Sequence, residues 1–81
     1  MISCDLHDYI EIACMFRYPV RVTLKQGQVL EGVAVDTQRN AQREECLQLQ
    51  QENTFTLVVL TDVAVMEACV DNPHFQRVAF V

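Results

Sequence analysis

The chain alternates apolar and polar residues in the stretch Val20-Arg21-Val22-Thr23-Leu24-Lys25, which is the period-two spacing of a half-buried β-strand. A turn at Gln26-Gly27-Gln28 leads into a second predicted strand, which runs from Val29 to about Asp36. Gly32 lies in the middle of that strand, where a glycine permits a sharp bend or a bulge. These residues therefore predict a β-hairpin that curls instead of lying flat.

Most of the chain beyond this hairpin also has strand character. Thr37 to Glu44 lacks apolar periodicity and is predicted to form a polar loop. Further strands are predicted to open at Cys46, to run from Thr54 to Leu60 and from Val63 to Val70, and to end the chain at about Phe75 to Val81. The segment ending at Leu60 is almost continuously apolar, so we expect both of its faces to be covered. Five or six short antiparallel strands predict a mostly β protein, a small and strongly bent barrel that closes its own edges.

The segment before the hairpin, from Ser3 to Met15, has the period of an amphipathic helix. Its apolar stripe, which we expect to pack on the barrel, consists of Leu6, Tyr9, Ile10 and Ala13. Its polar side consists of Asp5, His7, Asp8 and Glu11. Pro19 ends any helix by residue 18. The sequence therefore predicts a single domain, residues 1–81, with a helix at about 4–16 packed on a barrel at about 19–81.

The charge of the chain bears on its partners. The formal net charge is −5, whereas proteins that hold a phosphate backbone ordinarily carry a basic stripe. Direct binding of nucleic acid is therefore not expected. Asp5, Asp8 and Glu11 all precede Arg17, the first basic residue, and this asymmetry points to a basic partner. We expect a cytoplasmic protein that does not enter a membrane, because the apolar runs are short and acids stand where a signal peptide carries positive charge.

The polar side of the helix has two interpretations. It is either the solvated face of a packed helix or a contact surface. Ile12 and Met15 project near the acidic residues, and exposed apolar side chains beside charges are typical of a contact surface. In the polar loop, Arg39, Asn40 and Arg43 are likewise either solvated or paired with acids of a partner.

Metal and catalytic sites are not expected. Cys4, His7 and Cys14 offer three soft ligands, but no second CxxC or HxxxH pattern completes a zinc site. Reduced thiols are expected throughout, with Cys46 and Cys69 as buried apolar residues. The chain has no GxSxG, glycine-rich phosphate loop or HExxH motif. We therefore expect neither an enzyme nor a cofactor.

Two stretches carry a resemblance to a known family. Ile2-Ser3-Cys4-Asp5-Leu6-His7-Asp8-Tyr9-Ile10-Glu11-Ile12-Ala13-Cys14 resembles the opening of the Rho-binding antiterminators of the Rof type, with their Cys-Asp pair and Glu-x-Ala-Cys tail. The stretch from Val22 to Asp36 is similar to that family and, more loosely, to the first motif of Sm-like proteins. The likeness continues through Leu57 to Met66 and the last strand.

The resemblance implies an Sm-like barrel with an N-terminal helix. It also implies that the protein binds the N-terminal RNA-binding domain of the termination factor Rho, blocks the loading of RNA and reduces Rho-dependent termination. Asp8 and Glu11 are expected as principal contacts, with Asp5, His7 and Tyr9 nearby. Arg39 and Asn40 are implied as contacts at a second place.

Two other functions remain open from the sequence. An Sm-like module that binds RNA or forms rings is the main alternative, because of the strand-turn stretch from Leu24 to Asp36. A barrel with an unrelated partner is the third. A Rho-binding protein of this kind is expected to be a monomer when free, whereas the Sm-like module predicts rings and affinity for oligonucleotides that falls with salt.

Overall fold

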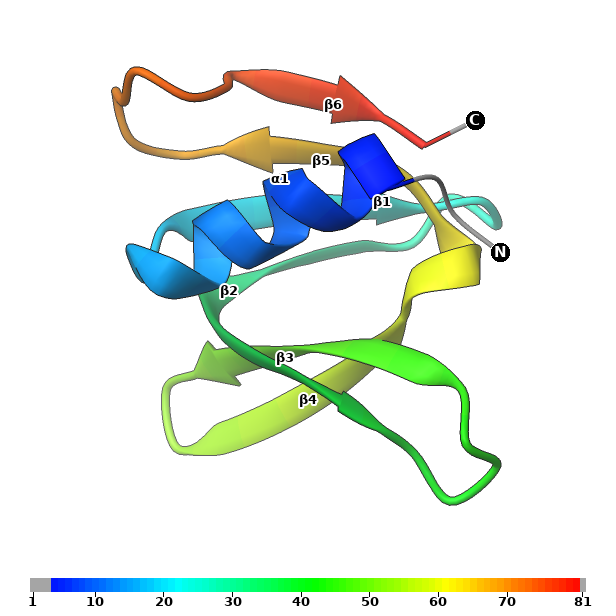
Figure 1. Ribbon diagram of the computed structural model, residues 1–81. Coiled ribbons are helices and arrows are strands. Elements are labelled where there is room, and N and C mark those ends of the chain that lie inside the picture. The colour runs from blue at the N-terminus through cyan, green and yellow to red at the C-terminus, as the bar shows by residue number, and fades with distance from the viewer. Residues whose placement is uncertain (1–3, 81) are drawn as a thin grey trace.

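The computed structural model describes residues 4–80 and consists of one helix and one antiparallel sheet. The elements are α1 (Cys4–Met15), β1 (Pro19–Leu24), β2 (Val29–Arg39), β3 (Glu45–Gln51), β4 (Thr54–Val59), the 3₁₀ turn η1 (Leu60–Asp62), β5 (Val63–Ala68) and β6 (Arg77–Ala79). The six strands lie in the order β4-β3-β2-β1-β5-β6, and α1 lies against β2 (Figure 1). The predicted mostly β class with an N-terminal helix is confirmed.

Strand β2 bends the sheet because its two halves pair with different neighbours. Val29 to Val33 pair with β1, whereas Val33 to Arg39 pair with β3, with a shift in register between Ala34 and Asp36. Gly32 lies just before this change, and a Cβ atom there would lie 2.9 Å from the carbonyl oxygen of Gln50. The predicted bend is present, and the absence of a side chain at Gly32 allows the backbones of β2 and β3 to approach closely.

The predicted polar loop from Thr37 to Glu44 is wrong in its first three residues. Thr37, Gln38 and Arg39 continue β2 and pair with Leu47, Cys46 and Glu45. Backbone hydrogen bonds to β3 hold this extension, so it needs no apolar side chains of its own. The loop itself is confined to residues 40–44.

The sheet is bent but open, so the prediction of a barrel that closes its edges fits only loosely. Strands β4 and β6 form its two ends. Consequently β4 is not covered on both faces, as its apolar sequence had predicted: Phe55 is 58% exposed and Leu57 is 38% exposed. Helix α1 lies over β2 and not over β4 (Figure 1).

The core lies between α1 and the concave side of the sheet. From the helix, Ile10 and Ala13 are fully buried, and Leu6 and Tyr9 pack partly against them, as the apolar stripe predicted. From the sheet, buried residues include Val20, Val22, Ala34, Leu47, Leu49, Val58, Val63, Met66 and Val78. The burial of one helical stripe leaves the other side of α1 facing outward.

The C-terminus of α1 ends in a Schellman motif. The backbone N–H of Tyr18 donates to the carbonyl of Ala13 at 2.9 Å, and that of Arg17 donates to the carbonyl of Cys14 at 3.2 Å. Arg17 takes the left-handed φ of 53° that this motif requires. The helix therefore ends one residue earlier than predicted, and the chain enters β1 directly.

The last strand is shorter than predicted. It covers only residues 77–79, because Phe75 is buried as part of the preceding loop. That loop is organised by Asn72, whose Oδ1 accepts hydrogen bonds from the N–H groups of His74 and Phe75. Val81 and Ser3, which the predicted elements included, lie outside the described residues. In the part of the chain from 4 to 80, no helix has the length and apolarity needed to cross a membrane.

Candidate functional site: an acidic helix face beside an arginine loop

The outward side of α1 carries three exposed carboxylates. Asp5, Asp8 and Glu11 follow one another at intervals of three residues, which places them along one side of the helix. Within residues 4–80 none of the three forms an ion pair or a side-chain hydrogen bond. The structure therefore leaves this row of negative charge open to solvent, as the polar side of the predicted helix required.

A shallow hollow of about 310 Å³ lies on this acidic face. It is lined by Asp5, Asp8, Tyr9 and Ile12. The Tyr9 ring packs edge-on against Phe75, with 5.7 Å between ring centroids, so its position is fixed from below. Ile12 was predicted to project beside the acids; it lines the hollow but is also partly buried against the core. Met15, with the same prediction, is 71% exposed.

His7 has a partner in the sheet. Its Nε2 atom lies 3.4 Å from Oε2 of Glu45, the first residue of β3, and both side chains are partly exposed. His7 therefore contacts the sheet, although its side chain stays 29% exposed to solvent. This contact lies where the N-terminal half of α1 approaches the hairpin of β2 and β3.

The loop of this hairpin is held by Asn40. Its Oδ1 accepts hydrogen bonds from the N–H groups of Gln42 (3.0 Å) and Glu44 (2.9 Å), and its Nδ2 donates to Oε1 of Glu44 at 2.9 Å. Arg43 has a left-handed φ of 66°, and its carbonyl accepts a hydrogen bond from the Arg39 guanidinium at 2.9 Å. The Asn40 amide thus shapes the loop, which carries Arg43 and directly follows Arg39 at the end of β2.

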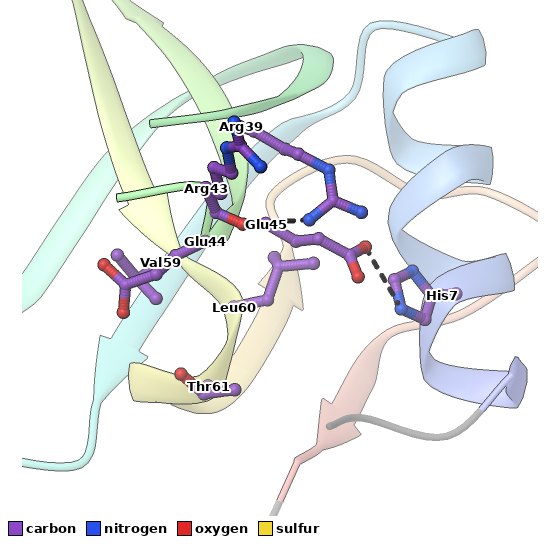
Figure 2. Close-up of a pocket in the computed structure, with 8 residues that line it drawn as sticks. All are labelled: His7, Arg39, Arg43, Glu44, Glu45, Val59, Leu60 and Thr61. Carbon is purple, nitrogen blue, oxygen red and sulfur yellow. Dashed lines mark hydrogen bonds and ion pairs between the residues drawn. The ribbon is translucent and has the colours of Figure 1, made fainter. Parts of the chain in front are cut away.

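Helix and loop meet at a cavity of about 240 Å³. It is lined by His7, Arg39, Arg43, Glu44, Glu45, Val59, Leu60 and Thr61. In Figure 2 a dashed line joins the His7 ring to the Glu45 carboxylate, whereas the Arg39 guanidinium is bonded to the Arg43 carbonyl. The structure therefore brings His7 and Arg39 together, whereas Asp5, Asp8 and Tyr9 line the separate hollow.

Sequence reasoning missed five members of this cavity, of which Glu45 is the one that contacts His7; the others are Glu44, Val59, Leu60 and Thr61. The signal for Glu45 lies in the hairpin register, which sets this residue opposite Arg39. That register depends on extending β2 to Arg39, and the polar composition of the segment concealed the extension.

The described cysteines are all free thiols. Burial, with a smaller contribution from the charge of Asp36, raises the pKa of Cys14 from 9.0 to about 11. Cys46 is buried as predicted, but the prediction for Cys69 is wrong: it follows the last residue of β5 and is exposed. The side chain of Cys4 lies outside the described part of the structure. Among the residues that are described, no cluster of three metal-ligating side chains occurs.

Fold and site together define a class: a small acidic protein with one helix on a bent sheet, in which the helix exposes a row of carboxylates and meets, through His7, a hairpin end that carries two arginines. Comparisons with known proteins show which family within this class the chain resembles. A family model described as "modulator of Rho-dependent transcription termination (ROF)" matches residues 1–80. A comparison with curated proteins finds no match.

A solved structure agrees with the family model. YaeO from Vibrio cholerae O395, described as bound to magnesium, is 46% identical and superposes with a TM-score of 0.89, over 91% of this chain and 96% of that one. The protein belongs to the ROF family of modulators of Rho-dependent transcription termination. Its family is regulatory, and Rho is the partner that the family's function implies.

Proposed function

We propose that this protein reduces Rho-dependent termination in the bacterial cytoplasm by covering the RNA-binding N-terminal domain of Rho with the acidic face of α1. The single observation that carries this proposal is the row formed by Asp5, Asp8 and Glu11. Like charges three residues apart on a helix cost a few tenths of a kcal/mol, and within residues 4–80 no basic side chain pairs with them. A basic partner would turn this cost into an attraction.

The hollow on the acidic face suggests how the contact is made. A lysine or arginine side chain of Rho would place its charge between Asp5 and Asp8 and its methylene groups against Ile12. The Tyr9 ring, fixed by Phe75, offers a surface for a cation. A site on Rho that holds RNA must carry such basic groups, so the carboxylates would replace phosphates there.

The hairpin loop is proposed as the second contact. Arg39 uses one N–H group on the Arg43 carbonyl and retains others for acidic groups of Rho. Asn40 has its side-chain oxygen engaged by two backbone N–H groups of its own loop. We therefore assign Asn40 the task of shaping the loop, and Arg39 the contact itself.

Reversal of charge on the helix tests the proposal. Asp8→Lys combined with Glu11→Lys should weaken binding to Rho by at least about 10-fold, because two attractive pairs become repulsive. It should also restore termination in a transcription assay with purified Rho. The matched control is Glu52→Lys with Asp71→Lys, which changes the net charge equally at exposed acids outside α1.

Thermal unfolding must be nearly unchanged in both variants for the comparison to count. Equal loss of affinity in the two variants would mean that net charge, and not this face, attracts Rho. Undiminished binding of the helix variant would exclude α1 as the contact. The free protein is proposed to be a monomer without affinity for RNA; ring-sized particles in light scattering, or a mobility shift with single-stranded RNA, would favour the Sm-like alternative.

A further inference from the structure

We propose that Glu45 is a positioning residue for the Rho complex, one that holds the helix face and the arginine loop at a fixed separation so that both contact the partner together. The inference rests on the proposed function and adds to it a residue that the family resemblance did not suggest. The Glu45 side chain contacts His7 on α1, and its backbone pairs with Arg39 at the base of the hairpin loop.

Glu45 is placed by the hairpin register. As the first residue of β3, it lies opposite Arg39, the last residue of β2. From this position its carboxylate reaches His7 on α1, with 3.4 Å between Oε2 and Nε2. Figure 2 shows the His7 ring and the Arg39 guanidinium on two sides of this carboxylate, and all three residues line one cavity. Glu45 thus contacts α1 through its side chain and pairs with the end of β2 through its backbone.

The loop that precedes Glu45, residues 40–44, is held by its own hydrogen bonds, so it should move together with Glu45. Asn40 makes three hydrogen bonds within residues 40–44, and the backbone N–H of Asn40 donates to the carbonyl of Glu44 at 3.1 Å. The Arg39 guanidinium is bonded to the Arg43 carbonyl. When the start of β3 moves relative to α1, the loop and its arginines therefore move as one body.

At the N-terminal end of α1, Leu6 packs only partly against the core, so the contact between His7 and Glu45 adds to the hold on the helix. Ile10 and Ala13 anchor its middle in the core, whereas His7 lies one turn closer to the N-terminus and is 29% exposed. An ion pair exposed to this degree adds little to folding stability. Its larger effect is on orientation, because a two-part contact loses affinity when its halves are free to shift.

The experiment measures Rho affinity for Glu45→Ala and Glu45→Gln. The alanine variant should bind about 2- to 5-fold more weakly, as expected for one partly exposed contact. The glutamine variant should keep near-normal affinity, because its amide has the shape of the carboxylate and can contact His7 at the same place. Glu31→Ala is the matched control, since it removes another exposed ion pair, the one between Arg21 and Glu31 at 2.9 Å.

A double-mutant cycle separates positioning from a general loss of structure. His7→Ala should cost little further affinity once Glu45 is alanine, because the two side chains act through the same contact. Additive losses would overturn the inference, as would a glutamine variant as weak as the alanine variant or an equal loss in Glu31→Ala.

The helix reversal variant separates this inference from the proposed function. If Asp8→Lys with Glu11→Lys does not weaken binding, the proposed function fails and Glu45 has no contact to position. If that variant weakens binding and Glu45→Ala does not, only the role of Glu45 fails.

Discussion

Arg43 and Arg17 hold backbone conformations that a glycine would adopt at lower cost. Their φ values are 66° and 53°, whereas Gly27, in the turn between β1 and β2, has 103°. A side chain with a Cβ pays about 1–2 kcal/mol in the left-handed region. Arg43 bears this conformational cost and lines the cavity beside Arg39 with a cationic side chain. A glycine there would avoid the cost but lose the charge, which supports the proposed role of the loop in binding.

Cys14 makes the stability of the protein depend on pH in the alkaline range. Burial raises its pKa from 9.0 to about 11, so the unfolded chain releases this proton at lower pH than the folded one. The unfolded state then binds fewer protons, and stability falls as the pH rises from about 9 to about 11.

We expect urea unfolding of the wild type to shift to lower midpoints across this interval, with a weaker shift in Cys14→Ala. Burial also raises the pKa of Cys46, so some dependence should remain in the variant. Identical pH profiles for the two proteins would show that Cys14 does not contribute.

At the scale of elements, the sequence predicted what depends on local periodicity. The helical stripe of Leu6, Tyr9, Ile10 and Ala13 appeared in the sequence because residues three and four apart share a helix face. The contact between His7 and Glu45 did not, since it joins residues far apart in the chain. It requires the hairpin register and the place of α1 over β2, and both are tertiary properties.

Strand β4 illustrates the same limit. Its apolar sequence indicated cover on both faces, but the position of a strand within a sheet is decided by all the strands together. At the end of the sheet, Val58 faces the core while Phe55 and Leu57 remain exposed. The prediction that both faces of β4 are covered was wrong, although the strand itself was predicted correctly.

Replacement of Gly32 by alanine has two effects on folding stability, and they have opposite signs. Replacing a strand glycine by alanine ordinarily stabilises a protein by about 0.4–1 kcal/mol, because the unfolded chain loses freedom. Here the new Cβ would lie 2.9 Å from the Gln50 carbonyl oxygen and 3.2 Å from the Cβ of Leu49, so β2 and β3 must separate. Such overpacking costs about 1–3 kcal/mol.

We therefore expect Gly32→Ala to lower the free energy of unfolding by a net amount on the order of 1 kcal/mol, measured by urea denaturation. A variant as stable as the wild type would mean that the two strands adjust freely at this bend.

At the scale of the whole molecule, the bent sheet matters because it brings the acidic helix next to a hairpin end of mixed charge. The chain has a net charge of −5, yet the hairpin end beside the helix carries Arg39 and Arg43 together with Glu44 and Glu45. A uniformly acidic surface would attract any basic protein. Under the proposed contact, a partner with complementary charges is favoured, and such complementarity favours specificity more than raw affinity.

Salt distinguishes this electrostatic contact from an apolar one on the same helix. Met15 is 71% exposed and Phe16 is 50% exposed, so the C-terminal end of α1 offers apolar surface as well. Screening shortens the Debye length from about 10 Å at 0.1 M salt to about 3 Å at 1 M. If the carboxylates carry the contact, the association rate with Rho should fall steeply over this range in surface plasmon resonance. It should fall much less for Asp8→Lys with Glu11→Lys. A wild-type rate that does not change with salt would assign the contact to the apolar end of the helix instead.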